Sequence, residues 1–290
     1  MLKSILMVWV LAFNPEDAAR TYSEQLGFVA GETGTVSSDL AHTLARPELA
    51  GRSFYTVYPE QGPATGIRWV EGGASAHRPM QRLGWSAIEL LVRDPDTLVA
   101  TLAGSNFRRL EGPAYLTEAK NVRAAQVLGP ANELLYVTRI LDPTRSILPV
   151  SPPSAAVGHP FIMVAGTADL DATRRFFDRH FANAVTDRIP FRIDVLSAAY
   201  GLPEDTQHDL ALVKFAEPYG FEFDQYPAEA AGQPLPPAQR GGVVLVTVSV
   251  DPASLPGELP WTLRYLDSEG EVAGGVVLLP SGTPLEIRFQ

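Results

Sequence analysis

Hydrophobic and polar positions along the chain alternate between a strand pattern and a helical pattern. Residues 5–11 are β-branched, aromatic or long aliphatic, which is typical of a buried strand. Asn14 and Pro15 then open a helical pattern that stops at Leu26 and Gly27. Further strands are expected from Phe28, at 53–58 and at 67–71, separated by Pro and Gly turns. The first 76 residues are therefore predicted to have the order β-α-β-β-β.

The same order recurs in three further segments, at 82–143, 157–227 and 240–290, and the last of them has an unusually short helix. The first and third segments share an insertion that reads helix, Pro-Glu turn, strand, Gly turn, strand. A Pro-rich stretch at 141–160 predicts an extended linker. It separates an expected N-terminal domain at 1–143 from an expected C-terminal domain at 157–290. Shorter linkers are expected at 71–84 and 227–242.

Composition narrows the classes of partner. The 290 residues are 46% hydrophobic and 19% charged, which predicts two globular cores. A net charge of -10 with no Lys/Arg run argues against nucleic acid. No apolar stretch reaches the roughly 20 residues of a membrane span, and no small-residue cleavage site follows the apolar N-terminus. The absence of cysteine excludes thiol chemistry. We expect a cytoplasmic protein that binds a small molecule, and homodimer formation stays open.

Short motifs in the modules resemble those of one superfamily. A strand is followed by Asn/Asp-Pro, by a helix ending TYSEQLGF or FFDRHFA, and by a final strand such as that in PSGTPLE. This pattern resembles the vicinal oxygen chelate superfamily, which includes glyoxalase I, extradiol dioxygenases and bleomycin-resistance proteins. The resemblance implies an α+β fold in which four βαβββ modules pair into two cup-shaped domains.

The resemblance also implies places for metal ligands on the inner strands of each cup. On the first strands these places hold Met7, Ala87, Ile162 and Val244. On the last strands they hold Glu71, Tyr136, Gln225 and Glu286. Each cup keeps at most one carboxylate where two to four strong ligands are needed, so no metal or other cofactor is expected. If a metal is bound after all, Glu286 is its expected ligand.

The five histidines lack ligand spacing, and we expect them to be solvated or held in the core. They are His42, His77, His159, His180 and His208. His159 is the exception to watch, because a slip of three residues would bring it to a cup.

Strand parity extends these places to a whole inner face. The N-terminal cup is predicted to carry Met7, Trp9, Leu11, Ile67, Trp69, Glu71, Trp85, Ala87, Glu89, Leu91, Tyr136 and Thr138. The C-terminal cup is predicted to be a packed core of Ile162, Val164, Phe221, Phe223, Val244, Val246 and Val248. Three tryptophans and two carboxylates in one concavity predict a small-molecule site, although tryptophans that merely form a core remain an open alternative.

The leading hypothesis is a metal-independent lyase or isomerase that binds an aromatic or apolar molecule in the N-terminal cup. Glu89, or else Glu71, is its candidate general base, and Tyr136 is the candidate donor to a developing oxyanion. Met7, Trp9, Trp69 and Trp85 are the candidate apolar contacts. Arg68 and Arg139 are the candidate polar contacts, either to the ligand or to Glu89 in a structural ion pair.

Two alternatives stay open. The first is a non-catalytic binding protein whose affinity depends on the tryptophans rather than on Glu89. The second is a metal-dependent dioxygenase or lyase with ligands from outside the expected places. The ligand and the reaction are not identified by the sequence.

Overall fold

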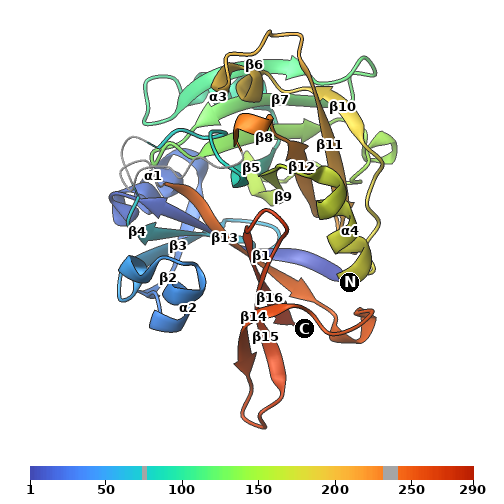
Figure 1. Cartoon of the computed structure of the whole chain (residues 1–290). Helices are drawn as coiled ribbons and strands as arrows, with labels where there is room; N and C mark the ends of the chain where they lie inside the picture. Colours follow the sequence, from blue (N-terminus) through green and yellow to red (C-terminus); the bar gives the residue numbers. More distant parts are fainter. Residues whose placement is uncertain (74–76, 231–240) are drawn as a thin grey trace.

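The computed structural model describes residues 1–73, 77–230 and 241–290. These residues form two eight-stranded mixed sheets with short helices (Figure 1). Parts of the two shorter expected linkers lie outside the described residues. None of the helices in the described ranges is long and apolar enough to cross a membrane.

The predicted order β-α-β-β-β is found in the first three modules, and in the fourth a 3-10 turn takes the place of the helix. The first contains β1 (Leu2–Ala12), α1 (Pro15–Leu26), β2 (Phe28–Thr35), α2 (Ser38–Thr43), η1 (Pro47–Leu49), β3 (Ser53–Pro59) and β4 (Gly66–Glu71). The second contains β5 (Gly84–Val92), α3 (Pro95–Thr101), β6 (Arg108–Tyr115), β7 (Val122–Leu128), β8 (Leu134–Ile140) and η2 (Pro143–Arg145). The third contains β9 (Val157–Thr167), α4 (Leu170–His180), β10 (Ile189–Arg192), α5 (Asp194–Ala199), β11 (Gln207–Lys214), β12 (Gly220–Gln225) and η3 (Ala228–Ala230). The fourth contains β13 (Gly242–Val250), η5 (Pro252–Ser254), β14 (Trp261–Leu266), β15 (Val272–Leu278) and β16 (Pro284–Phe289).

The helix after each first strand begins at a short polar residue whose side chain caps it. Asn14 accepts a hydrogen bond from the Asp17 amide in α1, and Asp169 accepts one from the Ala172 amide in α4. Helix α1 ends at Gly27, whose φ of 74° is the left-handed conformation that glycine adopts easily. In the fourth module only a 3-10 turn forms, because Pro256 follows so soon after it.

The modules pair in an order that differs from the prediction. Sheet A has the order β14-β15-β16-β13-β1-β4-β3-β2, and sheet B has the order β10-β11-β12-β9-β5-β8-β7-β6. The first module therefore shares a sheet with the fourth, and the second shares one with the third. Figure 1 shows β13 beside β1, although they are far apart in the sequence.

The expectation that successive modules within 1–143 and 157–290 form one cup each is therefore wrong. Each of the two segments contributes half of both sheets. The physical reason is that all four first strands are almost continuously apolar and buried. Each offers the same kind of free edge, so the hydrophobic pattern does not specify which edge pairs with which.

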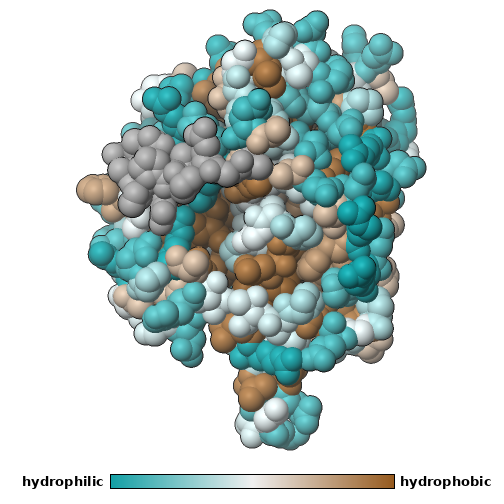
Figure 2. Space-filling view, viewed as in Figure 1, coloured by the Kyte–Doolittle hydropathy of each residue, from teal (hydrophilic) through white to brown (hydrophobic). Residues whose placement is uncertain are grey.

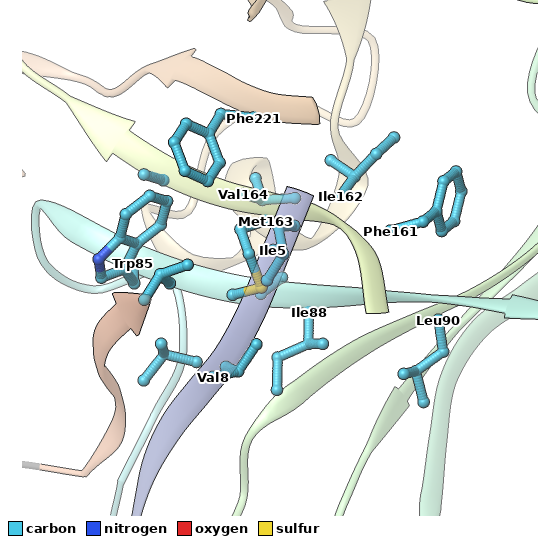
Figure 3. Close-up of a cluster of buried hydrophobic side chains, with 14 of the residues drawn as sticks. Ile5, Val8, Trp85, Ile88, Leu90, Phe161, Ile162, Met163, Val164 and Phe221 are labelled. Atoms are coloured by element: carbon cyan, nitrogen blue, oxygen red, sulfur yellow. The ribbon is translucent and has the colours of Figure 1, made fainter. Parts of the chain in front are cut away.

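The outer face of each sheet packs against helices and against the other sheet. Figure 3 shows Ile5 and Val8 of β1 beside Ile88 of β5 and Met163 of β9, and all four belong to one buried cluster. Burial of each such side chain contributes about 1.5–3 kcal/mol to stability. This core fixes the two sheets back to back and leaves their inner faces for the cups.

Candidate functional site

The strand registers define the inner face of each sheet. The sheet-A cup is the inner face that carries Met7, Trp9, Arg68, Thr247 and Glu286. The sheet-B cup is the inner face that carries Glu89, Tyr136, Thr138, Glu222 and Asp224. The residues predicted for one N-terminal cup are therefore divided between two cups.

Two of the predicted site residues in β4 lie on the wrong face for a ligand. Trp9 is opposite Arg68 in the β1–β4 register, so Arg68 enters the sheet-A cup while Trp69 and Glu71 point outward. The Trp69 ring packs against Tyr22 of α1, with ring centroids 4.8 Å apart. The expected placement of Trp69 and Glu71 was wrong because a register error of one residue moves every side chain of a strand to the opposite face of the sheet.

Glu71 is a surface residue at the end of β4. Its carboxylate accepts hydrogen bonds from Arg52 at 2.8 Å and from Ser53 at 3.1 Å, and its side chain is 40% exposed. The hydrogen bond from Ser53 and the charge of Arg52 lower its pKa. A solvated carboxylate of this kind does not fit the hypothesis that Glu71 is a desolvated general base.

Trp85 also lies outside the cup that contains Glu89. An irregularity in β5 between Trp85 and Ala87 turns the indole to the outer face, where its ring centroid is 4.9 Å from that of Phe221. Its Nε1 donates to the Pro284 carbonyl at 2.8 Å. The sequence pattern carried no signal for this irregularity, so the indole was placed on the wrong side.

Neither candidate arginine pairs with Glu89. Arg68 forms an ion pair with Glu32, and both residues lie in sheet A, whereas Glu89 lies in sheet B. Arg139 is opposite Arg123 on the face of β8 that α3 covers, whereas Tyr136 faces the cup. The expected structural ion pair of Glu89 is therefore absent among the described residues, and so is a role for Arg139 in the cup.

The sheet-A cup is filled and its polar groups are paired. Leu40 of α2 and Leu49 of η1 belong to one buried cluster with Met7 and Trp9. Glu286 is 2% exposed and is reached by polar partners on two sides. These contacts leave little space for a ligand and few polar groups without a hydrogen-bond partner.

The polar partners form a continuous network. The Trp9 Nε1 donates to Thr247 Oγ1 at 3.1 Å, and Thr247 donates to Glu286 at 2.6 Å. Arg288 donates to the other oxygen of Glu286 at 2.8 Å. The guanidinium of Arg68 stacks 4.5 Å from the centroid of the Trp9 ring. The buried carboxylate thus has both hydrogen-bond donors and a cation, which is the usual condition for burying one.

The sheet-B cup holds three carboxyl groups without a cation. Glu89 on β5 is opposite Tyr136 on β8, and Glu222 and Asp224 follow one another on the same face of β12. Glu89 is 7% exposed and Asp224 is 0% exposed, while Glu222 and Tyr136 are half-buried. Among the described residues, no Lys, Arg or His side chain lies within ion-pair distance of any of the three carboxyls.

Burial makes these groups hold their protons more tightly. It raises the pKa of Glu89 to about 8, and the charge of Glu222 adds to the rise. It also raises the pKa of Asp224 to about 7 and that of Glu222 well above its usual range, where Asp224 adds a second cause. The Tyr136 phenol has a raised pKa through burial and through the charges of Asp224 and Glu222, so it stays protonated at neutral pH.

Several polar atoms of the sheet-B cup have no hydrogen-bond partner in the described part of the chain. They are both carboxyl oxygens of Asp224, the hydroxyls of Tyr136 and Thr138, and Gln126 Oε1. Thr138 lies close enough to Glu89 to offset a part of its pKa rise, but outside hydrogen-bond geometry. Buried polar groups are nearly always paired, so a cluster of unpaired ones calls for partners that the described residues do not supply, such as water, an ion or a ligand.

A metal ion is what the resemblance implies for such a cup, but the side chains do not fit one. In the described ranges no three His, Asp or Glu side chains are grouped closely enough to hold an ion. The first-strand places hold Met7, Ala87, Ile162 and Val244, none of which is a ligand for Zn²⁺ or a similar ion. Glu286 is already engaged by Thr247 and Arg288. The reacting groups on offer are therefore carboxyls and a phenol.

The buried histidines add no ligand set. The His159 ring lies against Tyr219, with ring centroids 5.3 Å apart, and burial lowers its pKa to about 4. His208 shares a 2.9 Å hydrogen bond with Ser197. Both are core residues.

A separate cleft of about 140 Å³ lies between the β15–β16 turn and the start of β5. Arg82, Trp85 and Thr283 are among its lining residues, and no carboxyl group lines it. Figure 2 shows apolar residues gathered near the centre of the face in view, with hydrophilic residues around them. Because no carboxyl group lines this cleft, it lacks the acid–base groups that the sheet-B cup contains.

Glu222 and Asp224 are the site residues that the sequence reading missed. The segment YGFEFDQ alternates Phe with acidic residues, and the prediction turned Phe221 and Phe223 inward. In the structure these rings pack on the outer face, against Phe177 of α4. Two acidic residues on one face of a buried strand were a usable signal, but polar residues at period 2 normally face solvent.

Comparisons with known proteins agree with this architecture. No protein-family model and no curated protein matches the sequence. Among solved structures, glyoxalase I from Zea mays matches with a TM-score of 0.62 at 9% identity, covering 99% of this chain and 92% of that one. A proposed dioxygenase from Bacillus subtilis matches with a TM-score of 0.64 at 12% identity, covering 99% of this chain and 85% of that one.

The chain thus has the four-module fold of the glyoxalase and dioxygenase structures. The fold that the sequence motifs implied is therefore confirmed. At these identities the likeness carries no reaction over to this protein.

Proposed function

We propose that the sheet-B cup is the active site of an enzyme that moves a proton on a small molecule, with Glu89 as general acid and base. The observation that supports this most directly is the set of three buried carboxyls and a phenol that lack a cation. A pKa of about 8 gives Glu89 appreciable amounts of both protonation states near neutral pH. That is the condition for efficient general acid–base catalysis.

The reaction class that fits is isomerisation or elimination next to a carbonyl group. Glu89 takes a proton from carbon and returns it to another position or to the leaving group, so no further reactant is needed. Tyr136 stays protonated and can donate a hydrogen bond to the oxygen on which negative charge develops. The two groups are opposite each other on neighbouring strands, so both reach the same molecule.

The test is proton exchange in D₂O followed by NMR, with a panel of small ketones and β-hydroxy carbonyl compounds. A base next to a carbonyl exchanges the neighbouring proton even when no net product forms. Glu89→Gln is expected to lower the exchange rate about 100-fold. Glu286→Gln, which alters a carboxyl in the sheet-A cup, is the control and is expected to leave it unchanged. Exchange that survives Glu89→Gln, or a panel without any exchange, contradicts the proposal.

A non-catalytic binding protein is the second candidate function. It is favoured by Gln126 and Thr138, whose unpaired side-chain oxygens can hold a ligand but have no pKa suited to proton transfer. In that case Glu89→Gln alters affinity slightly and no compound turns over. Trp9 and Trp69, which were expected to govern the affinity, cannot both contact a ligand in the sheet-B cup. Trp9 lies in the sheet-A cup, and Trp69 packs under α1.

A further inference from the structure

The unpaired atoms of the sheet-B cup are mainly hydrogen-bond acceptors. When Asp224 is ionised, both of its oxygens and Gln126 Oε1 can only accept, and the hydroxyls of Tyr136 and Thr138 can accept as well as donate. Asp224 and Thr138 are fully buried, so bulk water does not satisfy them. A molecule that pairs these atoms must therefore supply N–H or O–H donors.

Charge restricts the molecule further. Glu222 and Asp224 lie at i and i+2 of β12 on the same face, and Glu89 is near enough for its pKa to respond to the charge of Glu222. An ionised carboxylate buried without a cation is strongly unfavourable. In the sheet-A cup the protein supplies the cation itself, as Arg288 beside Glu286. In the described part of the sheet-B cup it supplies none.

Apolar side chains border the carboxyls on the inner face of the cup. Ile162 and Leu212, which are both 8% exposed, lie on the same face as the carboxyls. Glu222 and Tyr136 are partly exposed, so they mark the edge at which the cup meets solvent. The ligand is thus expected to join a charged donor group to an apolar body.

We propose that the sheet-B cup binds an organic cation, an ammonium or guanidinium group on an apolar body, with its charge held by Glu222 and the neighbouring carboxyls. The proposal rests on the placement of the active site in this cup, and it adds the chemical class of the ligand. A charged donor group pairs acceptors and compensates negative charge at the same time, which a neutral donor does not.

Binding of a cation is then coupled to proton release. The titratable groups that face Glu222 and Asp224 are Glu89 from β5, Tyr136 from β8 and Tyr226 at the end of β12. The charge of Arg82 acts on Tyr226, but among the described residues no cation lies within ion-pair distance of the carboxyls, so the empty cup holds protons on them near neutral pH. A bound cation favours the ionised forms, and affinity must rise with pH between about 6 and 8 as fewer protons have to be displaced.

The experiment compares benzylamine with benzyl alcohol, its neutral analogue of similar shape, by calorimetry on the full chain at pH 6 and pH 8. Benzylamine is expected to bind at least about tenfold more tightly at pH 8 than benzyl alcohol, and more tightly at pH 8 than at pH 6. Titration in two buffers of different ionisation enthalpy is expected to show proton release. Equal affinity of the two compounds, no binding, or affinity independent of pH overturns the proposal.

Variants locate the binding site. Glu222→Gln is expected to weaken benzylamine at least about tenfold, while Glu286→Gln in the sheet-A cup leaves its affinity unchanged. Asp224→Asn is the second variant if Glu222→Gln folds poorly, with the same expected loss. Equal effects of the sheet-A and sheet-B variants overturn the proposal, and so does a response to Mg²⁺ or Mn²⁺ in place of benzylamine.

The outcome separates this inference from the proposed function. Benzylamine binding that depends on Glu222, without proton exchange on any carbonyl compound, supports the cation site and contradicts the catalytic role of Glu89. Proton exchange that depends on Glu89, without benzylamine binding, supports catalysis and overturns the cation site.

Discussion

The two cups have the same architecture but treat buried charge in opposite ways. In the sheet-A cup Glu286 is held by Thr247 and Arg288, and α2 with η1 fills the space above Met7 and Trp9. In the sheet-B cup neither oxygen of Asp224 has a hydrogen-bond partner, and no cation lies within ion-pair distance of the three carboxyls among the described residues. The comparison teaches that a carboxylate at a family ligand place is no sign of function in itself. What distinguishes the cup that we propose as the functional one is polarity that the protein leaves unpaired.

The largest expected effect is the dependence of stability on pH. Burial raises the pKa of Glu89 to about 8 and the pKa values of Asp224 and Glu133 to about 7, from ordinary values of 4.5, 3.8 and 4.5 respectively. The folded chain therefore binds more protons than the unfolded chain between about pH 4 and pH 8. The free energy of unfolding must fall as pH rises through that window. We expect a loss of more than about 3 kcal/mol between pH 5 and pH 8, which is the amount that the pKa shift of Glu89 alone corresponds to, measured by urea unfolding.

Two variants assign that loss to its source. Asp224→Asn removes a charge from the sheet-B cup and is expected to flatten the pH dependence. Glu133→Gln is the control for the pH-sensitive carboxyl outside both cups, which accepts from the Tyr22 hydroxyl at 2.8 Å. A free energy of unfolding that rises from pH 5 to pH 8, or an unchanged slope in Asp224→Asn, would mean that the cup carboxyls ionise as freely as exposed ones.

A matched pair of threonine variants sharpens the comparison at a smaller scale. Thr247 accepts from Trp9 and donates to Glu286, so Thr247→Val leaves two buried groups short of a partner. We expect it to destabilise the protein by about 2–4 kcal/mol. Thr138 has no hydrogen-bond partner, so Thr138→Val is expected to change stability by less than about 0.5 kcal/mol. Similar losses in the two variants would show that the Thr138 hydroxyl is paired after all.

The modules and their helices could be predicted from the sequence because their signals are local. Asn14 and Asp169 cap helices as expected, and Pro256 limits the fourth helix. Which residues share the inner or outer face of a sheet could be predicted only for strands whose register was inferred correctly from the sequence. Glu89 and Tyr136 do share a cup, since both belong to neighbouring strands of one module.

The remaining errors arise from longer-range determinants. Which module pairs with which depends on competition between similar strand edges, and no single module encodes it. The orientation of Trp85 depends on an irregularity opposite β9, a strand some 75 residues away in the sequence. Glu222 and Asp224 were assigned to the outside because the inner face of a cup reverses the usual rule that polar residues face solvent.

The smallest expected effect concerns Glu71, the other carboxyl that the sequence reading proposed as a base. It lies on the outer side of β4 and is paired with Arg52 in a solvated setting, where an ion pair contributes little because water and salt screen it. Glu71→Gln is therefore expected to leave the melting temperature, benzylamine affinity and any proton exchange unchanged, in contrast to Glu89→Gln. A loss of exchange in Glu71→Gln comparable with that in Glu89→Gln would mean that the reacting molecule lies at the end of β4. The distinction between the two cups would then no longer locate the chemistry.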